Sequence, residues 1–406
     1  MKKWQLAFIV PRYGQPILGG AETFVREMAN HVVASGLAHV EVFTTCASDH
    51  LTWQNDLPAG TASESGVLIH RFPVRRSRDN AARHIRLSAQ IAQHQVLAFE
   101  EQLDWASQNP HAPDLYAALA RHADRFDFLF FAPYLAGTTL FGTAISSGNS
   151  ILWPCLHDEP FAHLTLIRDM FHACRGIIFN AESEMLLAER LYGKNHKGAH
   201  LIGIGFDDAP IAQPERFRTK YELMGPFMLY SGRLEPAKNV ELLIAYFRQY
   251  CADWNGDPPI KLVLMGAGSV PIPTHPHIIG VGYQPHNQKA DAFAAASALC
   301  QPSINESFSI VLMESWQQSV PVLVNEYCDV TRQHVLNSNG GLLFASYEEF
   351  AATVDLLVDN DALRLTLGRN GKNYVKTQFS WDSTLERFEN ALCTWTQSEA
   401  SLFAAS

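Results

Sequence analysis

The sequence of 406 residues has few cysteines, no excess of positive charge and no long uninterrupted hydrophobic run. Its seven cysteines are scattered and form no Cys-x-x-Cys pair, which argues against a disulfide framework or a zinc site. They are typical of reduced core thiols in a cytoplasmic protein. The formal net charge of −10 excludes the basic domain of a dedicated nucleic-acid binder.

Two stretches resemble a signal peptide and a transmembrane helix, but each lacks a required feature. The N-terminus resembles a signal peptide, but its apolar part is short and ends at Pro11 without a small-residue cleavage site, so it favours a first β-strand. Residues 128–156 carry no charge and are long enough to cross a bilayer. Because proline and glycine interrupt them at Pro133, Gly137 and Gly142, they favour a buried strand, a helix and a second strand.

Short apolar runs alternate with helical patterns along the chain, which predicts an α/β protein with parallel sheets covered by helices. The first set of predicted strands is 6–10, 40–44, 67–72, 128–131, 151–154, 176–179 and 200–202, with helices that include 21–35, a long 81–107 and 161–173. The second set is 227–230, 261–265, 277–280, 298–301 and 321–324, with helices 240–250, 287–296, 310–317, 347–358, 363–377 and 381–398.

These two sets predict two Rossmann-like, doubly wound domains that face each other across a cleft. We expect the domains at residues 1–205 and 222–380, and the polar, proline-containing residues 206–221 between them as a linker. The helical pattern in residues 381–406 predicts a C-terminal helix that returns to the first domain.

A glycine turn with two cations ends the strand at 227–230. Arg233 and Lys238 lie five positions apart after Gly232, and an Arg fork with a Lys point charge suits a dense anion such as a diphosphate. After the strand at 298–301, Glu306 and Glu314 enclose seven residues that begin an apolar helix. Carboxylates bind hydroxyl-rich ligands, although one exposed and one capping Glu are also common on an ordinary helix. A diphosphate with hydroxyls at both ends is a nucleotide sugar.

Other motifs at strand ends are weaker. Gly19 and Gly20 begin a helix after the first strand, where backbone amides favour an anion. Gly266 follows another strand. A simple tight turn would explain the glycines at both places without a ligand. His157 ends the fifth predicted strand, where it could hydrogen-bond a sugar. The alternatives are a helix cap by Asp158 or a metal set of His157, Asp158, Glu159 and His163, which no Asp-x-Asp or close His pair supports.

One basic cluster stands out in this acidic chain, made of Arg71, Arg75, Arg76, Arg78, Arg83 and Arg86. Two interpretations remain open. The cluster either attracts anionic lipid headgroups or the phosphate of an acceptor, or it is a solvated face.

Taken together, these motifs resemble the family 4 glycosyltransferases, retaining enzymes of GT-B fold, over nearly the whole chain. The matching pieces are GGAE, SGRLEPAKN, LVLMGAGS, GYQP, NESFSIVLMES, SVPVLVN and SNGGLLF. This sequence departs from the family pattern at two points. Ser307-Phe308-Ser309 replaces the usual Gly-Phe-Gly, and Asn239 replaces the usual glycine after the lysine.

The resemblance implies roles for individual residues. Arg233 and Lys238 would bind the donor diphosphate, Glu306 the transferred sugar, Glu314 the ribose, and His157 would lie beside the reacting face of the sugar. The donor site would also include the following residues: Gly19, Gly20, Gly232, Gly266, Tyr283, Ser307, Phe308, Ser309, Ile310 and Val311.

The resemblance further implies the reaction. We expect a retaining transfer of a hexose-type sugar from a UDP- or GDP-sugar to a saccharide or lipid-linked acceptor, in the synthesis of cell-surface polysaccharide, lipopolysaccharide or glycolipid. No metal, cofactor or nucleic acid is expected, and the protein would be cytoplasmic, with peripheral membrane contact at the inner face if the arginine cluster binds lipid. A nucleotide-sugar epimerase of the same fold and a non-catalytic nucleotide-sugar-binding subunit are the alternatives.

Overall fold

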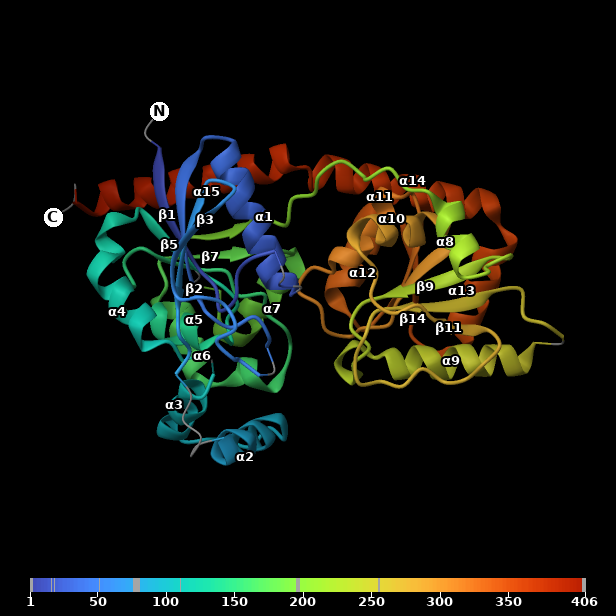
Figure 1. The fold of residues 1–406 in the computed structure, drawn as a ribbon, viewed down its shortest axis with the longest axis horizontal. Helices are drawn as coiled ribbons and strands as arrows, with labels where there is room; N and C mark the ends of the chain where they lie inside the picture. The colour runs from blue at the N-terminus through green and yellow to red at the C-terminus, as the bar shows by residue number, and fades with distance from the viewer. Residues whose placement is uncertain are drawn as a thin grey trace. The chain divides into compact units, whose positions relative to one another are not determined.

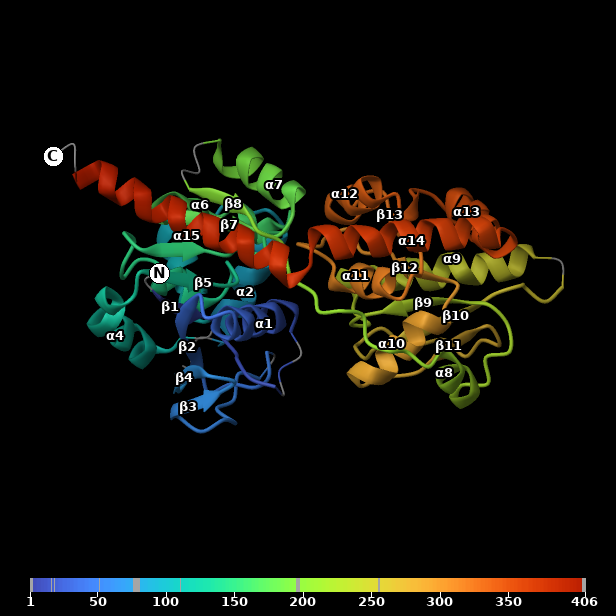
Figure 2. The same cartoon turned by 90° about the horizontal axis from the view of Figure 1, so that it is seen from above.

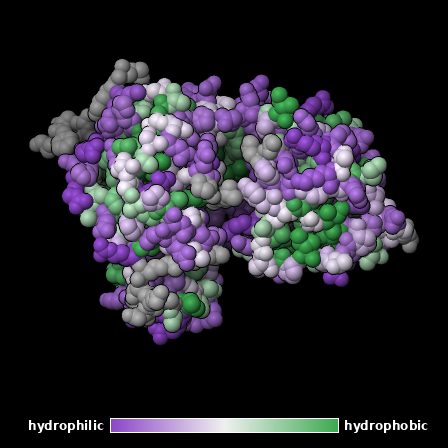
Figure 3. All heavy atoms as spheres, viewed as in Figure 1, coloured by the Kyte–Doolittle hydropathy of each residue, from purple (hydrophilic) through white to green (hydrophobic). Residues whose placement is uncertain are grey.

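The chain folds as two compact units, Met1–Gly205 with Trp381–Ser406, and Phe206–Ser380. The structure, a computed structural model, describes residues 3–403 except 16, 18, 51, 76–80, 110, 195–197 and 255, with backbone alone at 81, 286–287 and 398–403. Each unit is a sheet with helices on both faces (Figures 1 and 2). Hydrophilic and hydrophobic residues are mixed over the surface seen in Figure 3.

An eight-stranded sheet forms the first unit, in the order β3-β4-β2-β1-β5-β6-β7-β8. Its strands are β1 (Trp4–Ile9), β2 (Ala38–Thr45), β3 (Gly60–Glu64), β4 (Val67–Phe72), β5 (Phe128–Phe131), β6 (Ser150–Leu152), β7 (Gly176–Phe179) and β8 (Ala199–Leu201). All neighbours are parallel except β3 and β4. The strand order reverses between β1 and β5.

Helices of the first unit cover both faces of its sheet. They are α1 (Gly20–Ala34), α2 (Ala81–Ala92), α3 (Phe99–Ser107), α4 (Pro113–His122), α5 (Gly137–Gly142), α6 (Thr165–Ala173), α7 (Glu182–Tyr192) and α15 (Trp381–Phe403), with short 3-10 turns η2 (Ala123–Arg125) and η3 (Pro160–His163). The His31 ring of α1 stacks on Trp381 of α15, and Trp395 packs against Phe128 of β5. The C-terminal helix is therefore part of this unit.

A six-stranded, fully parallel sheet forms the second unit, in the order β11-β10-β9-β12-β13-β14. Its strands are β9 (Phe227–Ser231), β10 (Lys261–Met265), β11 (Ile278–Gly280), β12 (Ala298–Gln301), β13 (Val322–Asn325) and β14 (Gly341–Phe344). The order reverses between β9 and β12. Open α/β sheets bind ligands at such a topological switch point, outside the carboxyl ends of the strands.

The helices of the second unit also lie on both faces of its sheet (Figure 1). They are α8 (Pro214–Lys220), η4 (Pro236–Lys238), α9 (Val240–Asp253), α10 (His286–Ala295), α11 (Ile310–Gln317), α12 (Asp329–Ser338), α13 (Tyr347–Asp359) and α14 (Asp361–Gln378). For example, α9 lies on one face, and α10 and α11 lie on the other. Phe247 of α9 and Phe350 of α13 pack on Leu262 and Leu264 of β10 in one core. On α11, Trp316 is fully buried and donates a hydrogen bond from Nε1 to the carbonyl oxygen of Gly340.

The predicted α/β class with two parallel-sheet units is confirmed, but some elements differ. The first sheet has an antiparallel edge strand, β3, whose exposed sequence lacks the alternation of apolar residues that would predict it. The predicted helix 81–107 is two helices, because His94 turns into a left-handed conformation (φ 57°) after the first. The sequence also gave no prediction of α12 and β14.

Two further expectations can be compared with the structure. Residues 206–221 contain α8 and group with the second unit, because Phe217 is buried against Tyr221 and Phe227. Residues 128–156 form β5, α5 and β6, as expected. Within the described part of the chain, no helix combines the length and apolar character needed to span a bilayer.

Candidate functional site

The switch point of the second unit gathers the charged motifs. Arg233 and Lys238 follow β9, and Glu306 follows β12, the strand that pairs with β9 across the reversal. Parallel strands end at the same edge, so these side chains meet there although about 70 residues separate them in sequence. Lys238 of the cation turn contacts Glu306 directly, and the ligand roles of both residues stay predictions.

Two glycines allow the ends of β9 and β10 to approach each other. A Cβ atom on Gly266 would lie 1.8 Å from the carbonyl oxygen of Gly232, and both residues have positive φ, 148° and 154°. The backbone of Gly232 donates to the carbonyl oxygen of Met265 at 3.0 Å. Gly266 is thus required by backbone packing, whichever ligand binds nearby.

An ion pair occupies the centre of this edge. Lys238 Nζ lies 2.7 Å from Glu306 Oε1, and the two side chains are only 21% and 10% exposed. Gln301 at the end of β12 donates an amide hydrogen bond to the same carboxylate oxygen at 3.3 Å. Arg233 is more exposed and pairs with Glu235 at 2.8 Å. The site therefore holds two cations, and one of them is already bound to the predicted sugar carboxylate.

In the turn between Glu306 and Glu314, the residue that precedes α11 has a strained backbone conformation. Ser309 caps α11 with φ 70° and ψ 74°, a left-handed conformation that suits glycine, and its buried hydroxyl has no hydrogen-bond partner among the described residues. Ile310 and Val311 begin the helix, so their amides point into the turn. These amides can bind an anion or a polar sugar atom.

A buried histidine, His334, packs against Phe308 of this turn. His334 of α12 packs edge-to-face on Phe308, and its Nδ1 lies 3.1 Å from the Tyr374 hydroxyl. Burial lowers the pKa of His334 to about 4, while a hydrogen bond with the Phe308 backbone acts in the opposite direction. The imidazole is therefore neutral at physiological pH and serves packing. Nothing in the sequence distinguished this histidine from the others.

The second carboxylate has its own lysine, which sequence reasoning missed. Lys289 Nζ contacts Glu314 Oε1 at 2.7 Å and Oε2 at 2.6 Å. Lys289 comes from α10, and a contact between side chains of two helices leaves no local pattern. Tyr283, expected in the donor site, precedes α10 and is exposed.

In the first unit, His157 lies on the loop after β6, which is the sixth strand because β3 adds one. Its Nδ1 is 3.9 Å from Glu159, which accepts a 2.6 Å hydrogen bond from the Tyr134 hydroxyl. The loop is anchored by buried Glu184, which accepts from the backbone N–H of Leu156 at 2.6 Å and of Asn180 at 2.7 Å. Burial raises the pKa of Glu184 to about 8, and backbone hydrogen bonds oppose this rise. The role of His157 stays a prediction.

The glycine turn after β1 encloses a salt bridge. Arg12 Nη2 lies 2.5 Å from Glu22 Oε1, and both residues are buried. A Cβ atom on Gly19 would lie 2.0 Å from Glu22 Oε2, whereas one on Gly20 would meet nothing within 4 Å. Packing of Glu22 thus explains Gly19 without a ligand, and the donor role of both glycines stays a prediction.

Two of the four arginines of the cluster that the structure describes, Arg75 and Arg83, pair with acidic side chains. Arg75 pairs with Asp114 at 3.0 Å, Arg83 pairs with Asp104, and Arg71 donates to the carbonyl oxygen of Tyr13. Arg76 and Arg78 lie outside the described residues. These pairs favour the solvated-face interpretation.

No metal-binding group of three or more His, Cys, Asp or Glu side chains occurs among the described residues. The sequence Asp359-Asn360-Asp361 has the Asp-x-Asp form, but Asn360 caps α14 and Asp361 pairs with Arg364. All seven cysteines are free thiols; Cys393 is exposed, which corrects the expectation that all of them are core residues.

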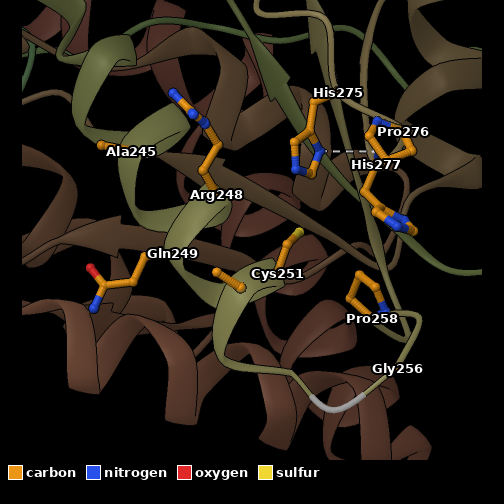
Figure 4. A pocket seen from close by; sticks show the side chains of 10 residues that line it. Ala245, Arg248, Gln249, Cys251, Gly256, Pro258, His275, Pro276 and His277 are labelled. Carbon is orange, nitrogen blue, oxygen red and sulfur yellow. Dashed lines mark hydrogen bonds between the residues drawn. The ribbon is translucent and has the colours of Figure 1, made fainter.

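A hollow of about 660 Å³ lies elsewhere on the second unit (Figure 4). Its lining includes Arg248 and Cys251 at the end of α9 and His275 and His277 before β11. In a βα unit, the end of the helix and the start of the strand lie at the amino edge of the sheet. This hollow is therefore at the edge opposite the charged motifs, and we do not assign it to the same site.

Comparison with known proteins agrees with this geometry. Residues 213–374 match the family model described as glycosyl transferases group 1. The matched segment lies within the second unit and includes both cation–carboxylate pairs. This segment of the chain is therefore similar to that family.

Similar proteins extend the match to the first unit. D-inositol 3-phosphate glycosyltransferase of Jonesia denitrificans is 22% identical over 58% of this chain and 61% of its own length. The protein of that name in Kineococcus radiotolerans is 23% identical over 91% of this chain and 88% of its own length. The chain thus covers about 61% of the length of the first relative.

Solved structures share the whole fold. Sucrose-phosphate synthase from Thermosynechococcus elongatus has a TM-score of 0.72 at 19% identity, with all of both chains covered. Anabaena HepE in complex with UDP-glucose has a TM-score of 0.68 at 14% identity, over 96% of this chain and 100% of HepE. At these identities the likeness concerns the fold, and the expected GT-B class is confirmed.

Proposed function

We propose that this protein transfers a hexose-type sugar from a nucleoside diphosphate sugar to an acceptor hydroxyl, with retention at the anomeric carbon. The observation that carries the proposal is the Lys238–Glu306 contact of 2.7 Å at the switch point, a few residues before α11 begins. A lysine that binds phosphate and a carboxylate that binds sugar hydroxyls must be close together, because the two groups are adjacent in the donor.

In the proposed reaction, the bond between the anomeric carbon and the diphosphate oxygen breaks, and the acceptor oxygen bonds to the same face of that carbon. The acceptor proton goes to the departing phosphate, so nucleoside diphosphate is released. Arg233, Lys238 and the helix amides would stabilise the negative charge that develops on the diphosphate. Glu306 would hold sugar hydroxyls and Glu314 the ribose. Because protein cations neutralise the phosphates, the proposal requires no metal.

UDP- and GDP-sugars are the proposed donors, and HepE was solved with UDP-glucose. The proposed acceptor is a saccharide or a lipid-linked sugar. Peripheral membrane contact would require basic side chains beyond the paired Arg75 and Arg83.

A donor screen tests the proposal. UDP-, GDP-, ADP- and dTDP-glucose are each incubated with the protein and a panel of saccharide acceptors, and the anomeric configuration of the product is read by NMR. Retained transfer that persists in excess EDTA is expected. An epimerised donor, binding without turnover, an inverted product, or activity that EDTA abolishes and magnesium restores would each contradict a stated part of the proposal.

A further inference from the structure

Lys289, which has no role in the proposed reaction so far, binds Glu314, the second carboxylate of the site. Lys289 of α10 hydrogen-bonds both oxygens of Glu314 on α11, at 2.7 and 2.6 Å. The two side chains are 26% and 16% exposed, so most of this pair is removed from water. Among the described residues, no other hydrogen bond to the Glu314 carboxylate is found.

The contact with Lys289 leaves the Glu314 carboxylate able to accept further hydrogen bonds. An ionised carboxylate has about four lone-pair positions, and Lys289 uses one on each oxygen. Two positions therefore remain, one on each oxygen, which matches the two neighbouring hydroxyls of a ribose. Because both oxygens are held by one ammonium group, the plane of the carboxylate cannot rotate freely.

The lysine itself is held in place. Its ammonium lies 5.8 Å from the centre of the Phe293 ring, one turn further along α10. A small hollow of about 20 Å³ adjoins the pair and is lined by Pro210, Ala290, Phe293, Gln317 and Gln318 together with the two charged residues. A buried carboxylate without such a cation would be costly, and it would have to find another partner by moving.

We propose that Lys289 is a positioning residue of the nucleotide site, which fixes Glu314 in the orientation that accepts both hydroxyls of a ribose. This inference rests on the proposed function, in which Glu314 binds ribose. It adds that the choice between a ribonucleotide and a 2′-deoxyribonucleotide depends on a side chain from α10. A site built to bind a hydroxyl discriminates strongly against a ligand that lacks it, provided that the carboxylate cannot adapt.

The experiment measures a ratio of affinities by calorimetry, with UDP against 2′-deoxy-UDP and GDP against 2′-deoxy-GDP. We expect wild-type protein to prefer its ribonucleotide by on the order of tenfold, the value of one charge-assisted hydrogen bond. Lys289→Met should reduce this preference to within about twofold of that in Glu314→Gln. Lys289→Arg, which keeps a cation, should retain most of it.

Controls separate positioning from simpler effects. Lys220→Met removes a lysine of the same unit that bonds Gln288 at 2.8 Å, and it should leave the preference unchanged. Thermal unfolding of each variant verifies folding, and Lys289→Gln replaces Lys289→Met if the latter is unstable.

Failure of the inference can be told apart from failure of the proposed function. A wild-type protein that binds neither nucleotide contradicts the proposed function. If Glu314→Gln reduces the preference but Lys289→Met does not, the inference alone is wrong. Tighter ribonucleotide binding by Lys289→Met would also overturn it, because the lysine would then compete with ribose.

Discussion

At the level of single residues, the proposed function implies a donor site whose own charged side chains contact each other. Lys238 takes the place next to Glu306 that a sugar hydroxyl would take, and Glu306 takes the place next to Lys238 that a phosphate would take. A pair with this little exposure gains from its mutual attraction but loses much of its hydration. Nucleotide binding must therefore exchange one partner for another rather than fill an empty space.

Replacing Lys238 by Ala should lower kcat/KM on the order of 30- to 150-fold, or about 2–3 kcal/mol, because one charge-assisted contact to the departing diphosphate is lost. The fold should persist, since the residue ends a short 3-10 turn. Steady-state kinetics with the donor found in the screen measures the loss. Lys376→Ala, at an exposed position in α14, is the control, and wild-type turnover in Lys238→Ala would refute the assignment.

Glu306→Gln should have opposite effects on binding and on transfer. The resemblance alone predicts nearly normal affinity for the bare nucleotide. The ion pair changes this expectation, since loss of the carboxylate charge frees Lys238 for phosphate, and affinity for the bare diphosphate should rise several-fold. Transfer should fall, because the sugar loses its acceptor group. Calorimetry with UDP and GDP provides the measurement; unchanged or weaker nucleotide binding would show that the pair does not compete with the ligand.

At the level of elements, helix α11 begins where the site needs a tight turn. Ser309 adopts a left-handed conformation at a position where the resembling family has glycine. We expect Ser309→Gly to be more stable than Ser309→Ala by about 0.5–1 kcal/mol, because alanine keeps the Cβ strain and glycine relieves it. Both variants lack the hydroxyl, so their comparison isolates the backbone. Thermal unfolding decides, and an alanine variant of equal or greater stability would show that the turn is not strained.

Elements with a clear pattern were predictable from sequence, whereas those without one were not. The strands β10 and β12 and the helix α11 have the predicted bounds, since each is a short apolar run between turn residues. The edge strand β3 is exposed and polar, and the break at His94 depends on a backbone conformation that no residue type there demands. The polar helix α12 carries its buried residues among polar ones, which hides its core face.

At the scale of the whole chain, the residues of the candidate site were also predictable only where a sequence pattern placed them. Lys238 and Glu306 could be placed together because both follow strands, and strand ends of a parallel sheet meet at one edge. The Lys289–Glu314 pair and the hydrogen bond from Leu156 to Glu184 could not, because each joins two elements that meet only in the packed structure. Membership of the site is thus predictable where topology brings residues together and unpredictable where side-chain packing does.

Two buried groups, His334 in the second unit and Glu184 in the first, should contribute to stability with opposite dependence on pH. In the second unit, the pKa of His334 is about 4, below its ordinary value of 6.5. Between these values the unfolded chain binds a proton that the folded unit does not, so stability falls as the pH drops from about 6.5 to 4. In the first unit, the pKa of Glu184 is about 8, above its ordinary 4.5. There the folded unit keeps a proton that the unfolded chain releases, so stability falls as the pH rises from about 4.5 to 8.

Thermal unfolding of wild type, His334→Gln and Glu184→Gln at pH 5 and pH 8 tests this directly. Glutamine does not titrate, so each difference in Tm between wild type and variant isolates one group. Relative to His334→Gln, wild type should lose several degrees on going from pH 8 to pH 5, because the 1.5 pH units between 6.5 and 5 correspond to about 2 kcal/mol. Relative to Glu184→Gln, it should gain stability over the same change. If both differences are independent of pH, neither group titrates in the folded protein as its burial requires, and the opposed contributions of His334 and Glu184 are wrong.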